Sequence, residues 1–264
     1  MREKLVRPQF LNFGDEVIAA IAQDMNKNGY ACIPGFLNEQ QLAQLREQVA
    51  TEANIHNGQY FAHHGDTALA GSLLVSLKAA PELQSLLQEV YRQGAGQTAP
   101  SSEIFPVLRC VQGDSGRRES NCFHFDATLV TALVPVEIPQ EGKENERGHL
   151  LVFPNLRRVR SNVLINVAEK ALVQNAFSRK LISLGIVLRL LRPQRLQLVP
   201  GNLYLFWGYR SLHANEPCNP AFRRATAIFH YGDPHAGSLL TSLILTINQH
   251  RARRASQVGD HQPV

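Results

Sequence analysis

The stretch that decides the fold lies late in the chain and reads Arg224-Ala225-Thr226-Ala227-Ile228-Phe229-His230-Tyr231. β-Branched and aromatic residues are frequent in it, which is typical of a strand. Successive side chains of a strand point to opposite faces. We therefore expect one face of this strand to carry Arg224, Thr226, Ile228 and His230.

Short runs of similar composition recur upstream, from Ile104 onward, and Gly, Pro and Asn turn signals separate them. The further strands that we expect are Ile104 to Val111, Cys122 to Val136, His149 to Phe153, Gln197 to Val199 and Leu203 to Trp207. Many short strands with turns between them indicate a barrel or a jelly roll. The sequence predicts a mainly β fold with additional helices.

The first hundred residues show helical periodicity instead. One helix is expected over Asp15 to Asn28, ending near Gly29, because its apolar residues recur at helical spacing. Tyr30 to Leu37 is interpreted as a short strand and turn, after which Asn38 caps a second helix. A third helix is expected from Pro81 to Arg92. We expect residues 1–100 to form a helical support for the strands.

A further helical region interrupts the strands. Val159 to Leu191 is rich in Leu, Ala, Lys and Arg, which favours one or two helices inserted at about 157–195. Three uses are open for this insertion: a lid over a substrate site, a dimer surface, or attachment to a membrane or to an apolar or acidic substrate. The sequence shows no domain boundary, so we expect one domain over residues 1–264, with the strands at 104–250.

Composition is that of an ordinary globular protein, with 44% hydrophobic and 19% charged residues. The net charge is +5, and arginines gather between Arg157 and Arg195 and in the tail Arg251 to Arg254. We interpret these as solvated faces and expect no nucleic-acid partner. The four cysteines are scattered, Met1 to Leu5 lacks the apolar run of a signal peptide, and Leu181 to Leu191 is too short to span a bilayer. We expect a soluble, cytoplasmic protein without stable membrane insertion.

A His-x-Asp pair points to metal chemistry. His124 and Asp126 are two residues apart on an expected strand, so their side chains should share one face. His213, shortly after the strand Leu203 to Trp207, supplies a third ligand. Two imidazoles and one carboxylate that leave open positions are the facial triad of non-haem Fe(II) enzymes. We predict that His124, Asp126 and His213 bind Fe(II) and are catalytic.

A pair of arginines follows this third ligand. Arg223 and Arg224 lie ten and eleven residues after His213, and Thr226 comes two residues later. An arginine at the start of a strand can bind a carboxylate through two parallel hydrogen bonds, and the hydroxyl two residues on shares its face. This arrangement implies a co-substrate with a distal carboxylate.

Five phrases in this order resemble one known family. They are Gly29 to Leu37 followed by Gln40-Gln41-Leu42, His124-Phe125-Asp126, Gly148 to Pro154, Gly201 to Trp207, and His213 with Asn215. Together they resemble the phytanoyl-CoA dioxygenase-like branch of the Fe(II)- and 2-oxoglutarate-dependent oxygenases. The resemblance covers most of the chain.

The resemblance implies a double-stranded β-helix core that binds Fe(II), 2-oxoglutarate and O2. The 2-oxo and C1-carboxylate groups of 2-oxoglutarate would chelate the iron, and its C5-carboxylate would pair with the arginine after the second histidine. The co-substrate would be converted to succinate and CO2 while a small-molecule substrate is oxidised, with hydroxylation as the default outcome. The carboxylate of Asp126 argues against halogenation, since related halogenases have a small residue there.

Two arginines compete for the C5-carboxylate. Arg223 fits the family phrase better, whereas Arg224 with Thr226 recreates an Arg-x-Ser/Thr pair, and we prefer Arg224. Arg109, on an earlier strand, could point inward and help to bind 2-oxoglutarate, or point outward. Thr128 should share the face of the iron ligands, which makes it a candidate for a hydrogen bond to them.

Other histidines are interpreted more plainly. His63 and His64 form a loop pair that invites a second-metal interpretation but lacks spaced partners, and we expect His149, His230 and His235 to be structural or exposed. Two alternatives to the oxygenase are a non-catalytic β-barrel binding protein and a cupin-like metalloenzyme that does not use 2-oxoglutarate.

Overall fold

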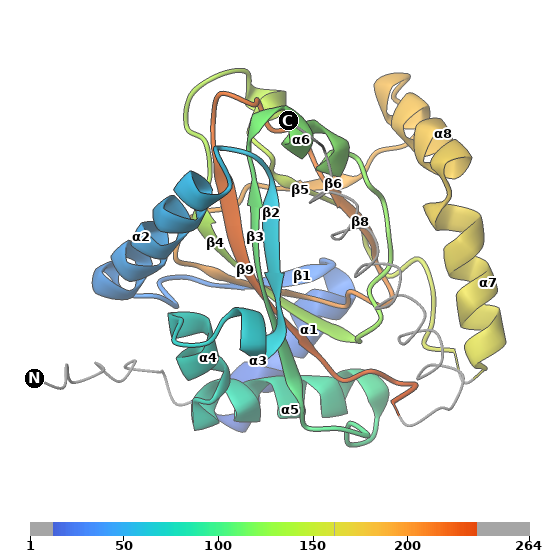
Figure 1. Ribbon diagram of the computed structural model, residues 1–264. Helices are drawn as coiled ribbons and strands as arrows, with labels where there is room; N and C mark the ends of the chain where they lie inside the picture. The colour runs from blue at the N-terminus through green and yellow to red at the C-terminus, as the bar shows by residue number, and fades with distance from the viewer. Residues whose placement is uncertain (1–12, 161, 237–264) are drawn as a thin grey trace, which may run out of the picture.

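The computed structural model describes residues 13–160 and 162–236, and in these residues two antiparallel sheets are flanked by helices (Figure 1). The larger sheet has the strand order β1-β7-β4-β9-β3-β2, and the smaller one has the order β6-β5-β8. This arrangement confirms the expected mainly β fold with a double-stranded β-helix core. The expectations for Met1 to Leu5 and for the basic tail Arg251 to Arg254 lie outside the described residues.

The elements have the following bounds. The strands are β1 (Tyr30–Ile33), β2 (Phe61–His64), β3 (Ile104–Val111), β4 (Val130–Glu137), β5 (Leu150–Phe153), β6 (Gln194–Leu196), β7 (Leu203–Phe206), β8 (Leu212–Asn215) and β9 (Arg224–Tyr231). The α-helices are α1 (Asp15–Lys27), α2 (Glu39–Ile55), α3 (Gly65–Ala68), α4 (Leu73–Lys78), α5 (Pro81–Ala95), α6 (Gly113–Gly116), α7 (Val163–Gln174) and α8 (Ala176–Val187).

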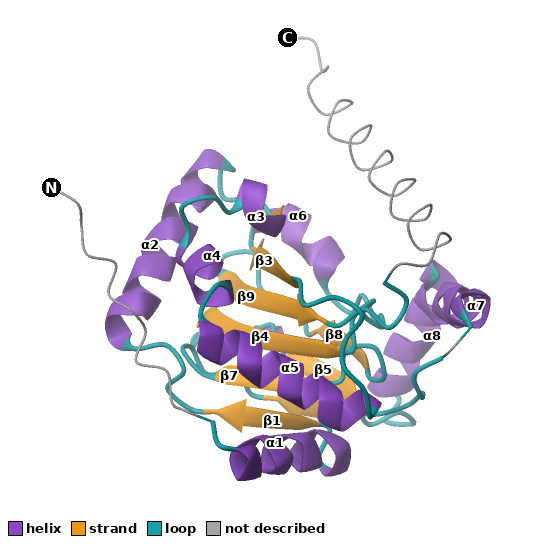
Figure 2. Cartoon of the chain, turned by 90° about the horizontal axis from the view of Figure 1, so that it is seen from below, coloured by secondary structure: helices purple, strands orange, loops and turns teal. Residues whose placement is uncertain are grey.

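The helices α1, α2, α4 and α5 cover the outer face of the larger sheet (Figure 2). The expected start of α2 is confirmed, because the side chain of Asn38 accepts a hydrogen bond from the backbone N–H of Gln41 at 2.8 Å. The side chain of Gln41 in turn accepts from the backbone N–H of Asn38. This reciprocal capping fixes the first turn of the helix.

Strand β9 separates two environments. Ala225, Ala227, Phe229 and Tyr231 belong to the core between this sheet and the helices. The alternate residues Arg224, Thr226, Ile228 and His230 line a cavity between the two sheets. The alternation expected from the sequence is confirmed, and it makes β9 the strand that presents polar groups to the interior.

Two of the expected strands are wrong in their bounds. Cys122 to Val136 is not one strand, because the chain crosses between the sheets around His124 and enters the larger sheet only at Val130. Gln197 to Val199 is not a strand, because β6 ends at Leu196. There the hydroxyl of Tyr204 takes the place of a strand partner, donating to the carbonyl of Gln197 and accepting from the N–H of Val199.

Strands β2 and β8 were not expected. Residues Phe61–His64, interpreted from the sequence as part of a loop, pair with β3, with His63 opposite Leu108. Residues Leu212–Asn215, which contain the predicted ligand His213, pair with β5. Each of these strands has only four residues and includes at least one histidine, so its pattern does not distinguish it from a polar loop.

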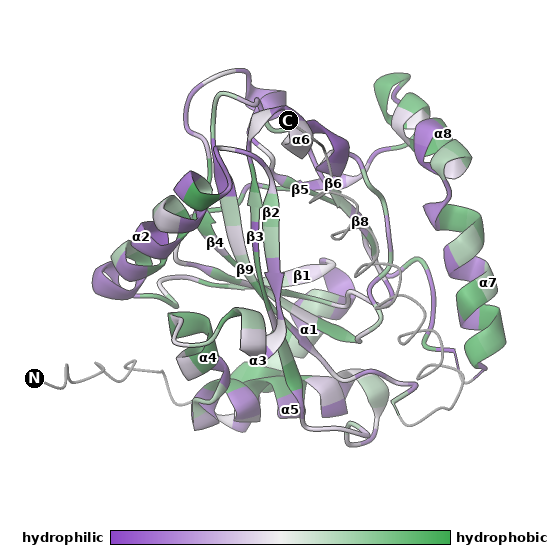
Figure 3. Ribbon diagram, in the orientation of Figure 1, coloured by the Kyte–Doolittle hydropathy of each residue, from purple (hydrophilic) through white to green (hydrophobic). Residues whose placement is uncertain are grey.

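The insertion forms two helices, α7 and α8, which stand beside the smaller sheet (Figure 1). Val173, Ile182 and Ile186 pack against a cluster that includes Phe123 and Phe125. The outward faces remain apolar, and Figure 3 shows hydrophobic residues along both helices. Leu172 and Phe177, for example, are 70% and 71% exposed. Within the described ranges, no helix is both long enough and apolar enough to cross a bilayer.

Gly94 of α5 offers a test of how tightly the helices pack on the sheet. A methyl group at Gly94 would overlap the indole ring of Trp207, which is fully buried. Alanine is favoured over glycine inside a helix by about 1 kcal/mol. We nevertheless expect Gly94→Ala to lower the free energy of unfolding by about 1–3 kcal/mol, because overpacking a rigid core forces side chains out of place.

Urea unfolding measures this change. Gln93→Ala, at the neighbouring exposed position, is the control and should alter stability by no more than about 0.5 kcal/mol. A Gly94→Ala variant more stable than the parent would show that α5 does not rest on Trp207.

Candidate metal and carboxylate site

The backbone holds the predicted metal ligands between the two sheets. His124 and His213 form a reciprocal pair in which each backbone N–H donates to the carbonyl of the other at 3.0 Å. The N–H of Asp126 donates to the carbonyl of Gly208, also at 3.0 Å. Asp126 is therefore positioned by the connection between β7 and β8 and not by a strand, contrary to the sequence-based expectation.

The three side chains converge. The Nε2 atom of His124 lies 3.4 Å from Oδ1 of Asp126, and the Nε2 atom of His213 lies 3.5 Å from Oδ2. All three donor atoms lie within 4.8 Å of one another. Donor atoms that share one ion at about 2.1 Å are roughly 3 Å apart, so a single metal ion could take all three.

Both imidazoles are held in the form that binds a metal. The Nδ1 atom of His124 lies 2.8 Å from the carbonyl oxygen of Cys122, and that of His213 lies 3.0 Å from the carbonyl oxygen of Ser211. A carbonyl oxygen can only accept, so each Nδ1 must carry the proton. The lone pair is then on Nε2, which faces Asp126 in both rings.

Asp126 is buried, with 8% of its surface exposed, and the hydroxyl of Thr131 donates to its Oδ2 at 2.5 Å. Burial alone would raise the pKa of this carboxyl, but the imidazoles of His213 and His230 outweigh it and hold the pKa well below its usual range. Burial lowers the pKa of His213 to about 4. An ionised carboxylate beside a neutral imidazole is the state that metal binding requires.

The structure corrects the expectation that Thr128 forms a hydrogen bond to a metal ligand. The hydroxyl that reaches a ligand is that of Thr131, whereas Thr128 lies 3.3 Å from Nδ1 of His230. The expectation assumed one continuous strand, and the turn before Val130 changes which residues share a face. Thr131 approaches so closely because residue 208 is glycine: a Cβ there would overlap both the Asp126 carboxylate and the Thr131 hydroxyl.

His230 is a cavity residue that the sequence interpretation missed. Its Nδ1 atom lies 3.8 Å from Oδ2 of Asp126, and burial lowers its pKa. The signal was available, because His230 shares a strand face with Arg224 and Thr226. His149 and His235 are structural, as expected: His149 accepts from the N–H of Leu198, and His235 bonds to Tyr209.

The cavity holds about 530 Å³, and Arg224 and Thr226 line it together with the metal ligands. Arg224 is 1% exposed and donates from Nε to the carbonyl of Gly148 at 2.5 Å. Its Nη2 has no hydrogen-bond partner among the described residues. Burial, and then repulsion from Arg109, lower the pKa of Arg224 to about 9. A buried guanidinium that lines a cavity with an unpaired donor is suited to bind an anion.

This combination of groups sits in a known type of barrel. The fold is similar to that of a Pseudomonas putida prolyl-4-hydroxylase (TM-score 0.51, 12% identity, covering 81% of this chain and 98% of that one). It is also similar to that of the non-heme alpha ketoglutarate dependent epimerase SnoN from nogalamycin biosynthesis (TM-score 0.53, 15% identity, 83% and 84% covered). A third similar structure is HygX from Streptomyces hygroscopicus with nickel and 2-oxoglutarate bound (TM-score 0.50, 14% identity, 81% and 86% covered).

The chain shares its fold with a prolyl hydroxylase, with an alpha ketoglutarate dependent epimerase and with a protein that binds 2-oxoglutarate. At these identities the similarity is one of fold. No protein-family model and no curated protein sequence matches the chain. The narrower resemblance to phytanoyl-CoA dioxygenases therefore stays a prediction.

The other predicted arginines are placed differently. Arg223 lies outside the cavity and pairs with Glu137 on β4, so Arg224 is the arginine that faces the predicted co-substrate site. Arg109 points inward from β3 and lines the cavity, where Glu119 neutralises it. Arg109 is thus an inward residue, but its charge is already paired.

The insertion forms part of the wall of the cavity. Gln174 of α7 and Arg179 of α8 line it, and they donate to the backbone carbonyls of Phe125 and Phe123, respectively. Arg157 is stacked between the rings of Phe125 and Tyr209, at 4.3 and 4.0 Å from the ring centroids. The helices are thereby attached to the segment that carries His124 and Asp126.

Thr131→Val tests the bond that orients the carboxylate. The change removes the hydroxyl but keeps the shape of the side chain, so Asp126 loses a buried donor and with it a fixed orientation. We expect affinity for a divalent ion such as Mn²⁺ to fall by about 10–100-fold. Isothermal titration calorimetry measures the loss, with Thr128→Val as the matched control that keeps most of the affinity. Equal losses in the two variants would contradict the assignment of Thr131.

Proposed function

We propose that this chain is a non-haem Fe(II)- and 2-oxoglutarate-dependent dioxygenase that hydroxylates a small-molecule substrate and releases succinate and CO2. One observation carries the proposal. Two imidazoles and a carboxylate with converging donor atoms, and a buried, incompletely paired guanidinium, line the same cavity. The cation at Arg224 distinguishes this cavity from a simple metal site, because it is suited to a second, anionic ligand.

The residues fit both groups. His124, Asp126 and His213 would hold Fe(II), since two imidazoles and one carboxylate are the donor set of this class of iron centre. Arg224 and Thr226 would hold the C5-carboxylate of 2-oxoglutarate through the free Nη2 donor and the hydroxyl. Leu133, Phe206 and Ile228 also line the cavity and would contact the methylene groups of the co-substrate.

When bound, the iron would activate O2, which is the oxidant; 2-oxoglutarate, on becoming succinate and CO2, and the substrate, on hydroxylation, would each give up two electrons to it. The chain supplies the positions of the metal ligands. Thr131 fixes the carboxylate of Asp126, while Cys122 and Ser211 fix the tautomers of the two histidines. Gln174 and Arg179 also line the cavity and would contact the substrate.

The alternatives are less well supported. A cupin-like metalloenzyme without 2-oxoglutarate would have no use for the unpaired guanidinium of Arg224. A non-catalytic binding protein would have no need for two histidines fixed in the metal-binding tautomer. The carboxylate of Asp126 argues against halogenation, because it would take the place that a halide needs beside the metal. Membership in the phytanoyl-CoA dioxygenase-like branch, a single domain and a cytoplasmic location belong to this proposal.

Asp126→Ala is the direct test of the iron site. Fe(II)-dependent conversion of 2-oxoglutarate to succinate should fall by at least about 100-fold, because loss of a group that merely orients a ligand already costs about 10–100-fold. The circular dichroism spectrum should be unchanged. Asp114→Ala removes an exposed carboxylate that pairs with Arg117 at the surface, and it should keep the parent rate. Turnover at the parent rate in Asp126→Ala would mean that the ligand assignment is wrong.

Arg224→Gln tests the co-substrate site. The loss of a charge-assisted hydrogen bond costs about 1.5–3 kcal/mol, so the Kd for 2-oxoglutarate should rise by about 10–100-fold. Calorimetry on the Mn²⁺-loaded protein gives this constant without turnover. Arg223→Gln is the matched control, since its guanidinium pairs with Glu137 outside the cavity. The assignment is overturned if Arg223→Gln weakens the binding of 2-oxoglutarate and Arg224→Gln does not.

A further inference from the structure

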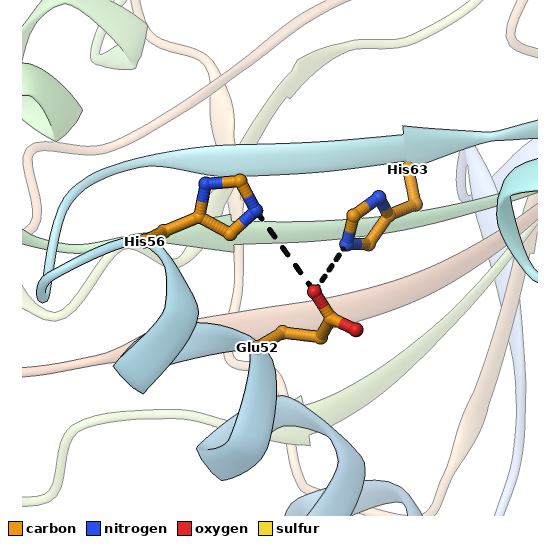
Figure 4. A group of neighbouring side chains, drawn as sticks. All are labelled: Glu52, His56 and His63. Atoms are coloured by element: carbon orange, nitrogen blue, oxygen red, sulfur yellow. Dashed lines mark hydrogen bonds and ion pairs between the residues drawn. The ribbon is translucent and has the colours of Figure 1, made fainter.

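A second group of metal-type ligands lies outside this cavity. Glu52 and His56 come from the last turn of α2 and its cap, and His63 comes from the neighbouring strand β2 (Figure 4). The sequence offered His63 no spaced partners. The fold supplies them, because the turn after α2 brings β2 back alongside the end of the helix.

The three side chains point toward one another. The Nε2 atom of His63 lies 2.9 Å from Oε2 of Glu52, and the Nε2 atom of His56 lies 3.9 Å from the same oxygen. All three donor atoms fit within 4.8 Å. Donor atoms around a tetrahedral zinc ion lie about 3.3 Å apart, so rotations of these side chains suffice to place an ion between them.

The surroundings hold the ligands in place. Glu52 and His56 are four residues apart on α2, the spacing that puts two side chains on one helix face. His63 is fixed by pairing with Leu108 of β3. The ring of Phe61 stacks on His56 at 4.9 Å and lies 5.4 Å from His63. The side chains are partly buried, with 26%, 38% and 22% exposed for Glu52, His56 and His63.

We propose that Glu52, His56 and His63 form a second metal site, which binds a divalent ion of the zinc class. Two imidazoles and one carboxylate suit Zn²⁺, Co²⁺ or Ni²⁺, whereas Mg²⁺ and Ca²⁺ prefer oxygen ligands throughout. Three protein ligands on a partly exposed surface leave a fourth position for water. In the absence of an ion, the bond between Glu52 and His63 holds the group together.

The site has a structural consequence for the cavity. His63 and His64 are adjacent on β2 and point to opposite faces, and His64 lines the cavity with Tyr60. An ion at the second site would tie the end of α2 to β2 and so hold this wall of the cavity. Its role is to stabilise the wall and not to take part in the oxidation.

Counting ions tests the site. Metal-depleted protein is titrated with Zn²⁺ by calorimetry, and we expect two ions per chain in the parent. Glu52→Gln and His63→Gln should each bind one, and so should a His124→Ala/Asp126→Ala double variant, which retains only the second site. Glu47→Gln makes the same change at an exposed position of α2 and should keep both ions.

Thermal unfolding of the His124→Ala/Asp126→Ala protein gives a second measurement that is independent of oxygenase activity. Zn²⁺ at about 100 times its Kd should raise Tm by roughly 5 °C, and adding His63→Gln should remove the shift. The second site is excluded if the His124→Ala/Asp126→Ala protein binds no Zn²⁺, if Glu52→Gln or His63→Gln binds as many ions as the parent, or if Zn²⁺ leaves Tm of the double variant unchanged. These results do not depend on whether the first site supports 2-oxoglutarate turnover.

Discussion

The structure depends on the reciprocal backbone pairing of His124 with His213. Two residues far apart in the chain exchange hydrogen bonds at a point where neither needs a side chain to hold it. Their rings are then forced to the same side, with centroids 4.3 Å apart. The carbonyls two residues before each histidine fix the tautomers. Backbone geometry therefore determines the ligand positions, and Asp126 completes the set through its own backbone bond to Gly208.

The interior of the barrel carries charges that a simple hydrophobic core would avoid. Asp126 and Arg224 are both buried in one cavity, and neither is satisfied by the other, because each bonds to its own local partners. Burying charge is costly unless opposite charge meets it. A metal cation beside Asp126 and an anion beside Arg224 would each offset that cost. The cavity is in this sense preorganised for two ligands of opposite charge.

The regular alternation of Arg224–Tyr231 made the fold predictable, since a strand of eight residues shows which side chains share a face. The same rule failed between His124 and Val130, because a turn there changes the facing residue from Thr128 to Thr131. His230 was placed on the face of Arg224 but was interpreted as structural or exposed. The partners of His63 were beyond sequence reasoning, since they depend on how α2 and β2 pack. Local patterns predict local geometry, and contacts across a turn need the fold.

The attachment of α7 and α8 couples any movement of these helices to the positions of the predicted metal ligands. Gln174 and Arg179 bond to the carbonyls that flank His124, and the guanidinium of Arg157 between Phe125 and Tyr209 also bonds to Asn166 of α7. The two helices therefore cannot swing outward as a free flap. Any displacement of α7 and α8 large enough to admit a bulky molecule would pull on the peptide units beside His124 and Asp126. It would therefore also shift the metal ligands.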